Sequence, residues 1–439
     1  MIALNPTINF SKLAEDAEIS FVPMEVVDEN YGVIKSMGTK KRIDSKGFTK
    51  FQEGDLLWAK ITPCMQNGKS AIAENLVNGL GCGSTEFFVI RPKTDKIRTK
   101  YIHLILRDER ILQNAENFFG GSAGQQRVSK DFLLQLPIPV PPEAVQQQVI
   151  KIMDDAYEAK RRMEQEAKDL LDSINGYLLE ALGIALPPEE ENTLENRVFR
   201  VSSEQVLGGR FDPRKYTTKY QKIFTAIEHA PFEKKNLGEI ILDHISGNWG
   251  FDETEIGDEF ISCLTIRATE FDNKFNLNLE NSRTKYRKYT PQIYEKIALS
   301  PNEILVEKSG GSDDQPVGRV AFIEKDMVEE NTLAYSNFIH KLVVNEAEAY
   351  TRYVFEYLRL MHNIKATEVM QTQTNGIRNL IMREYFGQTI VLPDKSVQKR
   401  IADEASKMRA RAKELEVEAI NRIKEAKVQV EKILLEGSL

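Results

Sequence analysis

Two clusters of basic side chains interleaved with aromatic residues suggest contacts with a polyanion. Between residues 35 and 50, lysines and one arginine accompany Phe48, and Asp44 is the only acidic residue. Between residues 281 and 290, basic side chains accompany two tyrosines, again without an acid. Because Lys and Arg neutralise phosphates, both clusters predict contacts with a phosphate backbone. The predicted contacts are Lys40, Lys41, Arg42, Arg283, Lys285 and Arg287. For either cluster alone, the alternative is a solvated charged surface.

Polar loops punctuated by glycine carry the residue types that distinguish bases in DNA. Asn and Gln suit adenine, Arg and Lys suit guanine, and Ser or Thr suits either. Residues 62–69 link two expected strands and correspond to residues 308–316, and residues 120–127 correspond to residues 371–378. A plain turn also needs Gly, Asn and Pro, so composition alone does not separate the two interpretations. The candidates for base or phosphate contact are Lys60, Thr62, Gln66, Asn67, Lys69, Gln125, Gln126, Arg127, Lys308, Ser309, Arg319, Gln373, Asn375 and Arg378.

Motifs for catalysis are missing from the sequence. Gly68-Lys69-Ser70 resembles the end of a phosphate-binding loop, but Pro63 stands where that loop needs a glycine. The 5 histidines are scattered singly, and the 3 cysteines lack the spacing of a zinc site. The sequence therefore favours a binding protein over an enzyme, and it predicts no bound metal.

Length and composition suit a protein of two or three domains. The chain has 439 residues, 41% of them hydrophobic and 28% charged, with a net charge of −7. The acidic balance argues against a uniformly basic coat for nucleic acid, although a local basic surface is sufficient for binding. We expect no membrane span and no signal peptide, and the few cysteines fit a reducing cytoplasm.

Two long helices are predicted from apolar stripes with alternating steps of three and four residues. They cover residues 143–182 and 396–435 and would each be about 60 Å long, which implies coiled-coil pairing. A proline followed five residues later by a glutamine introduces each helix, with Pro142 and Gln147 matching Pro393 and Gln398.

The chain also contains an internal repeat. Segments 54–60 and 302–308, segments 68–74 and 318–324, and Tyr101 and Tyr353 match in the same order, about 250 residues apart. Short expected strands followed by a helix make each module α+β in class. We predict a first module over residues 1–142, a long helix over 143–185, a linker over 186–197, a second module over 198–394 and a second long helix over 395–437.

Several of these motifs resemble those of type I restriction–modification specificity subunits. In the first half the resemblance rests on residues 54–60, 67–71, 83–87 and 123–127, and on the entry to the long helix at residues 141–147. In the second half, residues 210–213 and 236–240 are similar to the usual opening of a second recognition domain. The resemblance implies two tandem α+β target-recognition domains separated and held by two long antiparallel coiled-coil helices.

The resemblance also implies a function in DNA recognition. Each domain would read one half of a split target in double-stranded DNA, and the subunit itself would be non-catalytic and bind no cofactor. It would hold two DNA methyltransferase subunits, which use S-adenosylmethionine to methylate adenine, and a restriction and translocation subunit, which needs ATP and Mg²⁺.

One feature departs from the expected repeat. Residues 198–244 have no counterpart before the first basic cluster, so the first module would lack an opening strand and leave an edge unpaired. Two alternatives to DNA recognition also remain open. One is a protein-interaction scaffold with a coiled-coil core, and the other is an enzyme, which the missing motifs disfavour.

Overall fold

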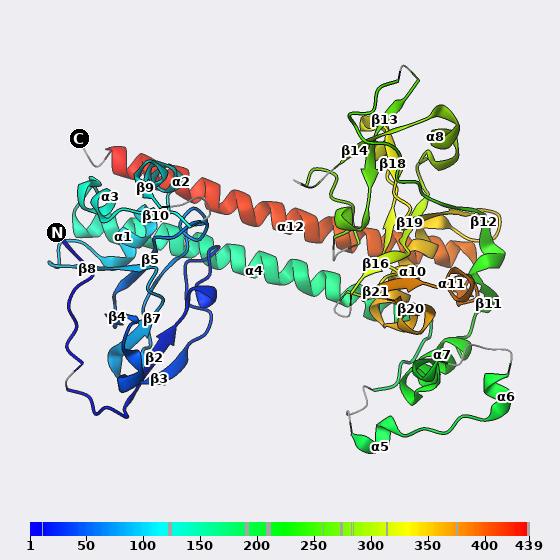
Figure 1. The fold of residues 1–439 in the computed structure, drawn as a ribbon, viewed down its shortest axis with the longest axis horizontal. Helices are drawn as coiled ribbons and strands as arrows, with labels where there is room; N and C mark the ends of the chain where they lie inside the picture. Colours follow the sequence, from blue (N-terminus) through cyan, green and yellow to red (C-terminus); the bar gives the residue numbers. More distant parts are fainter. Residues whose placement is uncertain are drawn as a thin grey trace. The chain divides into compact units, whose positions relative to one another are not determined.

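The computed structural model describes the chain except residues 11, 122–124, 189–192, 208–211, 258, 273–274, 282, 284, 313–314, 375 and 437–439. It divides into two compact units (Figure 1). Unit 1 contains Met1–Glu166 and Glu414–Leu439, and unit 2 contains Ala167–Lys413. The long helices α4 (Glu143–Ala181) and α12 (Lys395–Glu436) each contribute residues to both units. The module boundaries expected from the sequence therefore stay predictions, because this division falls within the helices.

Unit 1 contains two four-stranded sheets. The first has the order β1 (Ile2–Leu4), β8 (Phe87–Pro92), β5 (Leu56–Ala59) and β6 (Ser70–Ile72). The second has the order β3 (Gly38–Lys41), β2 (Glu18–Val22), β7 (Leu80–Gly83) and β4 (Thr49–Gln52), with β2 parallel to β7. Its helices besides the long ones are η1 (Met24–Val26), η2 (Arg42–Ser45), η3 (Val77–Gly79), α1 (Thr99–Leu106), α2 (Glu109–Ala115), η4 (Glu116–Phe118) and α3 (Lys130–Gln135).

The alternation of side chains along β5 explains the layers of unit 1. Leu56 and Trp58 point to one face, where they pack with α1, α3 and Val149 of α4. Leu57 points to the other face and packs with Phe51 of the second sheet. Because neighbouring side chains of a strand point to opposite faces, this strand is apolar throughout and is buried between a helical layer and a sheet.

Unit 2 repeats this architecture. Its central sheet has the order β12 (Ile241–Ser246), β19 (Ile339–Val344), β15 (Ile304–Glu307) and β17 (Val320–Phe322). Its second sheet has the order β14 (Tyr286–Tyr289), β13 (Ile261–Ile266) and β18 (Leu333–Tyr335), and β13 is parallel to β18 as β2 is to β7. Ile304 and Val306 pack in the helical core, whereas Leu305 packs against the second sheet. The common strand order confirms two tandem α+β modules.

Further elements of unit 2 surround this framework. The strand pair β11 (Glu233–Asn236) and β22 (Thr389–Leu392) and the sheet of β16 (Ser309–Gly311), β21 (Ile377–Leu380) and β20 (Gln371–Thr374) complete the strands. The helices are α5 (Leu194–Arg197), α6 (Ser203–Val206), η5 (Pro213–Tyr216), α7 (Thr218–Glu228), η6 (Leu237–Ile240), η7 (Ala268–Glu270), α8 (Pro291–Ile297), α9 (Lys325–Glu330), α10 (Thr351–Asn363), η8 (Ala366–Met370) and α11 (Met382–Phe386).

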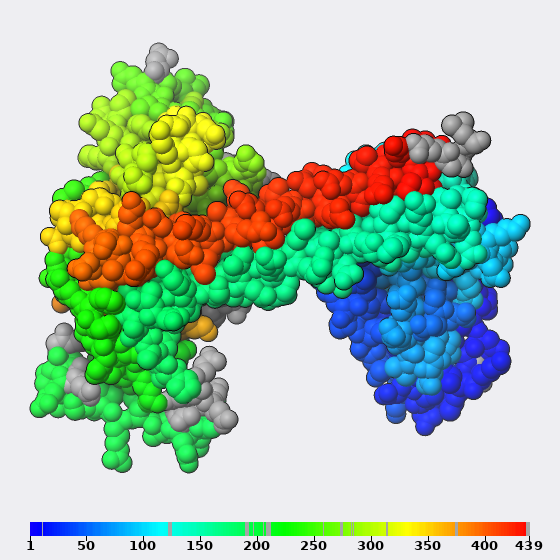
Figure 2. All heavy atoms as spheres, turned by 180° about the vertical axis from the view of Figure 1, so that it is seen from behind, coloured from blue at the N-terminus to red at the C-terminus, as the bar shows by residue number. Residues whose placement is uncertain are grey.

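The two long helices pack against each other within each unit. In unit 1, Met153 and Ala156 near the start of α4 share a cluster with Ala426 near the end of α12. Figure 2 shows these two stretches side by side, in green-cyan and red. In unit 2, Leu178 near the end of α4 shares a core with Ile401 near the start of α12. The helices therefore run antiparallel, as the resemblance implied, and both lie within one residue of the bounds 143–182 and 396–435 predicted from the apolar stripes.

A buried glutamine anchors the start of each long helix. In unit 2, Gln398 donates to the carbonyl of Pro393 (2.8 Å) and accepts from the Tyr350 N–H (2.9 Å). In unit 1, the residue with these contacts is Gln146, which donates to Pro141 (2.9 Å) and accepts from the Arg98 N–H (3.0 Å). The predicted match of Gln147 with Gln398 was wrong by one residue, because Gln147 lies on the exposed side of the helix.

Replacing Gln146 by alanine is expected to destabilise the protein by about 2–3 kcal/mol, because backbone groups at the helix start lose their partners. The matched control is Gln147→Ala, whose side chain is exposed and donates only to Glu143, and which should change stability by less than about 0.5 kcal/mol. Urea denaturation followed by far-UV circular dichroism measures both. Equal destabilisation by the two variants would contradict the anchoring role.

Candidate nucleic-acid interface

The structure brings together the two polar loops of the first module. The N–H of Thr62 donates to the Gln126 carbonyl (2.9 Å), and the N–H of Gln126 donates to Oγ1 of Thr62 (3.1 Å). The N–H of Val128 donates to the Lys60 carbonyl (2.9 Å). Strand β10 (Arg127–Val128) therefore lies beside the loop that leaves β5, where β9 (Phe119–Gly120) pairs with it. We call residues 60–69 with residues 125–128 the paired loops of unit 1.

The same arrangement recurs in unit 2. The N–H of Leu380 donates to the Lys308 carbonyl (2.7 Å), as Val128 does to Lys60. Ser309 lies opposite Asn379, and Gln373 lies opposite Arg378 in the β20–β21 hairpin. Residues 308–311 with residues 371–380 form the paired loops of unit 2. Asn375 lies outside the described residues, as does Gly124 in unit 1.

Exposed polar side chains lie on the paired loops of unit 1. Gln66 donates to Glu116 (2.9 Å), and Asn67 donates to Glu29 (3.2 Å). Both side chains are exposed, as is Gln125, whereas Gln126 is half-buried. These internal partners are acidic surface groups, so DNA contacts at Gln66 and Asn67 would replace existing hydrogen bonds.

The cations of the paired loops have different surroundings. Arg127 forms two hydrogen bonds with Glu86 (2.8 and 2.9 Å), which hold the pKa of the Glu86 carboxyl below its usual value. The ammonium of Lys60 lies 5.5 Å from the centre of the Phe88 ring, and Lys69 is half-buried. Lys308 donates to Oγ of Ser246 (2.6 Å), and burial lowers the pKa of its ammonium.

Two predicted arginines have structural roles in this fold. Arg319 is only 5% exposed and forms two hydrogen bonds with Glu307 (2.7 and 3.0 Å). It also donates to the carbonyls of Phe271 and Ala268 (3.0 Å each). Arg378 is likewise buried, on β21. Because the guanidinium of Arg319 is enclosed, we leave Arg319 out of the proposed DNA contacts.

The basic clusters lie on the second sheet of each unit rather than on the paired loops. Lys40 is on β3, with its ammonium 4.5 Å from the centre of the Phe21 ring, and Lys41 beside it is exposed. Arg42 donates to the Ala14 carbonyl (3.0 Å). In unit 2, Arg283 and Lys285 precede β14 and are exposed.

Arg287 on β14 supports an aromatic surface that the sequence did not predict. Its guanidinium lies 4.6 Å from the centre of the Trp249 ring and donates to the Gly250 carbonyl (3.3 Å). Arg287 itself is buried, but Trp249 and Phe251 are each 41% exposed and Tyr286 is 48% exposed. The tryptophan between Gly247 and Gly250 was the available signal, because Gly250 lets the backbone approach Lys288 and Tyr289 of β14 closely, as Gly247 does Tyr335 of β18.

The titratable groups of the described residues do not form a metal centre. No three His, Cys, Asp or Glu side chains converge in this part of the chain. Burial raises the pKa of the Cys82 thiol, and it raises the pKa of the Cys263 thiol to about 12. Burial lowers the pKa of His340 to about 4, so this ring is neutral beside His244 (3.0 Å).

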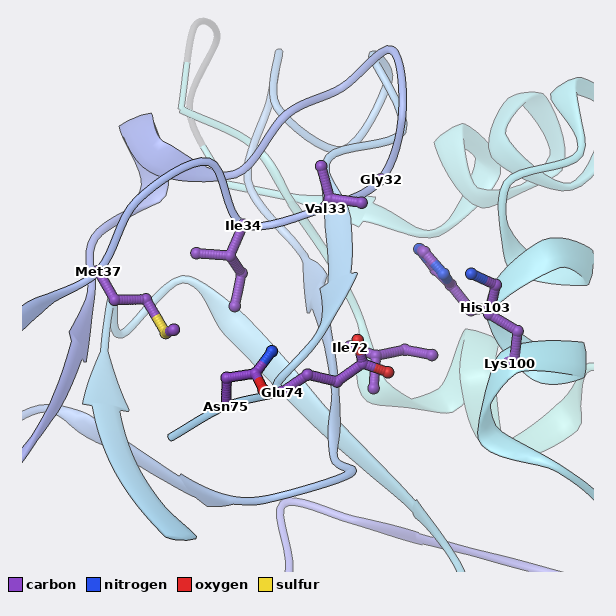
Figure 3. A pocket seen from close by; sticks show the side chains of 9 residues that line it. All are labelled: Gly32, Val33, Ile34, Met37, Ile72, Glu74, Asn75, Lys100 and His103. Atoms are coloured by element: carbon purple, nitrogen blue, oxygen red, sulfur yellow. The ribbon is translucent and has the colours of Figure 1, made fainter. Parts of the chain in front are cut away.

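A small pocket of about 140 Å³ lies in unit 1 (Figure 3). His103 and Lys100 reach it from α1, opposite the segment from Gly32 to Met37. Burial lowers the pKa of His103 to about 3, and its Nε2 lies 3.1 Å from Oγ of Ser70. Ser70 is completely buried and donates to the Gly68 carbonyl (3.1 Å), so this contact supports the loop rather than activating a nucleophile.

Comparisons with known proteins agree with this arrangement. Residues 2–173 match the model of the type I restriction modification DNA specificity domain. The chain is 35% identical over 200 residues to the specificity subunit of the type I restriction enzyme EcoAI from Escherichia coli, a match that covers 45% of this chain and 34% of that protein. It is 34% identical over 171 residues to the EcoEI specificity subunit from the same organism, covering 39% of this chain and 28% of that protein. The aligned regions thus span about a third of the length of these relatives.

A solved structure matches the whole fold. It comes from work on complex assembly and conformational transition of the type I restriction–modification system, with a TM-score of 0.56 and 15% sequence identity. The match covers 96% of this chain and 92% of that one. Residues 2–173 are thus similar to a type I restriction modification DNA specificity domain, in agreement with the resemblance stated from the motifs. The second module repeats its topology. No helix that the structure describes is both long and apolar enough to span a membrane.

Proposed function

We propose that this chain is the DNA sequence-recognition subunit of a type I restriction–modification complex. The observation that carries the proposal is the recurrence of the paired loops at the same place in two modules, with different side chains in each. Equivalent frameworks with different polar residues suit a bipartite target whose two halves differ. If each module reads one half of the target, the two modules must bind separate stretches of one duplex.

The paired loops supply the proposed contacts with bases. In unit 1 these are Thr62, Gln66, Asn67, Gln125 and Gln126, with Lys60, Lys69 and Arg127 on phosphate or guanine. In unit 2 they are Ser309, Gln373 and Asn375, with Lys308. The clusters around Lys40, Lys41, Arg42, Arg283 and Lys285 are proposed to contact the phosphate backbone. Arg287 is proposed to contribute to DNA binding indirectly, because it orients the exposed Trp249.

The long helices are proposed to dock the partner subunits. Two DNA methyltransferase subunits, which would bind S-adenosylmethionine, and an ATP- and Mg²⁺-dependent restriction and translocation subunit would complete the complex in the cytoplasm. The chain itself is proposed to be non-catalytic and to bind no cofactor. A protein-interaction scaffold is the second candidate, which the exposed apolar residues Val417, Ile420 and Val428 of α12 favour.

Selection from randomised duplex DNA tests the proposal. The protein is incubated with the duplex pool at two salt concentrations, with and without a methyltransferase partner, and the retained DNA is sequenced. We expect a two-part motif with a constant gap. Retention without a motif in the presence of the partner would contradict sequence recognition and indicate sequence-independent DNA binding. No retention under any condition would favour the scaffold.

Replacing Gln125 and Gln126 together by alanine is expected to relax one half of the motif only. Each hydrogen-bonded pair of a side chain with its base provides about 1–3 kcal/mol of discrimination, so one or two positions of that half should become degenerate. Sequencing of the retained DNA measures the change. An unaltered motif would contradict base contacts by this loop.

Lys69→Ala serves as the contrasting variant. A phosphate contact carries no sequence information, so its removal should weaken binding to all sequences and reduce the salt slope by about one unit. Gln147→Ala is the matched surface control, because its exposed side chain lies on α4 rather than on the paired loops. It should leave both the motif and the affinity unchanged.

A further inference from the structure

Backbone hydrogen bonds show which residues of the two modules correspond at the paired loops. In unit 1, the N–H of Lys60, which follows β5, donates to the Glu86 carbonyl (2.9 Å). In unit 2, the N–H of Lys308, which follows β15, donates to the Phe338 carbonyl (2.9 Å). Glu86 directly precedes β8, and Phe338 directly precedes β19. Glu86 and Phe338 are therefore counterparts.

Arg127 corresponds to Asn379 rather than to Arg378. Arg127 pairs with the residue that follows Lys60, and Asn379 pairs with the residue that follows Lys308. The match of Arg127 with Arg378 expected from the sequence was wrong by one residue. Because neighbouring side chains of a strand point to opposite faces, Arg378 is buried while Asn379 is only half-buried. The two modules thus present an arginine and an asparagine at one equivalent position.

Glu86 holds the guanidinium of Arg127 by one side and leaves part of it available. Nε and Nη2 of Arg127 donate to the two carboxylate oxygens of Glu86 (2.9 and 2.8 Å), and Nη1 donates to the Gln125 carbonyl (3.1 Å). A guanidinium has five N–H groups, so these contacts leave one on Nη1 and one on Nη2. The Arg127 side chain is 43% exposed. Two N–H groups are sufficient for a bidentate contact with O6 and N7 of guanine.

The Glu86 carboxylate favours a base over a phosphate as the partner of Arg127. Its negative charge balances that of the guanidinium and would repel a phosphate oxygen bound to the same group. The acceptors of guanine are uncharged, so they are not repelled in this way. In addition, a guanidinium that is already fixed in one plane loses less conformational freedom when a planar base binds.

In unit 2, an amide and an aromatic ring occupy the equivalent positions. Phe338 is 44% exposed. Both residues adjoin Ser309, whose N–H donates to the Phe338 carbonyl (3.2 Å) and which lies opposite Asn379 in the strand pair. An asparagine amide suits the N6 and N7 atoms of adenine, and an apolar side chain such as Phe suits the methyl group of thymine. Asn379 and Phe338 therefore offer the groups that match an A·T pair.

We propose that this equivalent position determines one base pair in each half of the target. Arg127, oriented by Glu86, binds a guanine in the half read by unit 1, and Asn379 binds an adenine in the half read by unit 2. Glu86 is a positioning residue, because it acts through Arg127. The assignment rests on the proposed function and adds to it the identity of two bases and the residues that select them.

Selection from randomised duplex DNA by the full chain with its methyltransferase partner tests unit 1. In Arg127→Ala, the preference for guanine at one position of one half should decrease at least about fivefold, because a bidentate contact is lost. Every other position of the motif should be retained. The Arg127 side chain lies at the surface, so this variant should fold normally.

Glu86→Gln separates positioning from a structural role. Without the carboxylate, the charge of Arg127 is no longer balanced and becomes available to phosphates. The guanine preference should decrease at least about fivefold at the position altered by Arg127→Ala, whereas binding to non-target DNA should become tighter, with a salt slope steeper by about one unit. Loss of structure would instead weaken binding to all DNA.

Glu109→Gln is the matched control for this variant. Glu109 lies on α2, its side chain is 80% exposed, and it pairs with Lys427 (3.2 Å). The substitution changes the net charge by the same amount as Glu86→Gln. It should leave the motif and the salt slope unchanged.

Transfer of the unit 1 pair into unit 2 provides the reciprocal test. In the double variant Asn379→Arg with Phe338→Glu, one adenine of the other half should be replaced by guanine in the selected DNA. Asn379→Ala alone should make that position degenerate, which keeps the test decisive if the double variant does not fold.

The outcomes separate this assignment from the proposed function. If the wild-type motif is retained in full by both Arg127→Ala and Asn379→Ala, the assignment is overturned and DNA recognition stands. If the wild-type chain selects no motif with its partner, the proposed function and the assignment are both overturned. An equal loss of binding to target and non-target DNA in Glu86→Gln would overturn the positioning role.

Discussion

Replacing Glu356 by glutamine is expected to lower the free energy of unfolding by about 3–5 kcal/mol. Glu356 lies on α10, is completely buried, and accepts two hydrogen bonds from Arg409 of α12. Its carboxylate also lies 3.3 Å from the guanidinium of Arg359, which is itself buried. Burial, and then the neighbouring charge of Arg409, lower the pKa of Arg359 to about 10. The substitution leaves two guanidinium groups without their shared counter-charge.

Urea denaturation of the full chain measures this change in stability. The matched control is Glu404→Gln on α12, because Glu404 is exposed and its partner Lys407 lies 3.4 Å away at the surface. Surface pairs contribute little, so this variant should be destabilised by less than about 1 kcal/mol. If Glu356→Gln is destabilised no more than the control, the buried cluster does not hold α12 to the second module.

Replacing Arg319 by methionine is expected to destabilise the protein by about 3–5 kcal/mol, because Glu307 is left buried and unpaired. Only 1% of the Glu307 side chain is exposed in its ion pair. Replacing both residues together, Arg319→Met with Glu307→Leu, should restore most of the stability, since a buried pair and an apolar pair of similar volume are often equivalent. A double variant as unstable as the single one would contradict this explanation.

The loss of stability caused by Arg319→Met is expected to depend on pH in a defined direction. Burial raises the pKa of the Glu307 carboxyl, and the hydrogen bonds from Arg319 oppose that rise. Without Arg319, the pKa in the folded state rises further above its value in the unfolded chain. A group with a raised pKa stabilises the fold at low pH and loses that contribution as the pH increases through the folded-state value. The loss of stability caused by Arg319→Met should therefore be smaller at pH 5 than at pH 8, as measured by urea denaturation. An equal loss at both pH values would refute the assignment of the effect to Glu307.

These two predictions bear on function because they separate arginines that maintain the fold from cations that remain available to DNA. Arg319→Met, measured below its lowered melting temperature, should keep the two-part DNA motif. Lys69→Ala should keep the stability and lose affinity. Since both residues belong to equivalent segments of the repeat, the difference arises from the environment of each side chain rather than from its chemistry.

Local patterns in the sequence were sufficient to predict the architecture. Apolar steps of three and four residues predicted the two long helices almost to the residue, because helical periodicity is set by neighbours within two turns. The ordered repeat of short motifs predicted two α+β modules, and the strand orders of the two units confirm it. The motifs of residues 54–60 and 67–71 were also enough to state the family resemblance.

Contacts between distant residues were decided only in the tertiary structure. Thr62 and Gln126 join the paired loops across 64 positions, and no periodicity in the sequence relates them. Arg319 was a candidate for DNA contact from the sequence, yet the strand pairing of β15 with β17 places it beside Glu307 in the interior. Gln146 and Gln147 are adjacent, and a rotation of about 100° around the helix separates a buried anchor from an exposed side chain.

The opening strand of the first module illustrates the same division. From the sequence, residues 198–244 had no counterpart in the first half, which predicted that the first module lacks an opening strand. This prediction was wrong, because β1 pairs with β8 in unit 1 as β12 pairs with β19 in unit 2. Hydrogen bonding between strands is set by the packing of whole layers, so the sequence alone determined the elements and their order, and the tertiary structure decided which of their surfaces are covered.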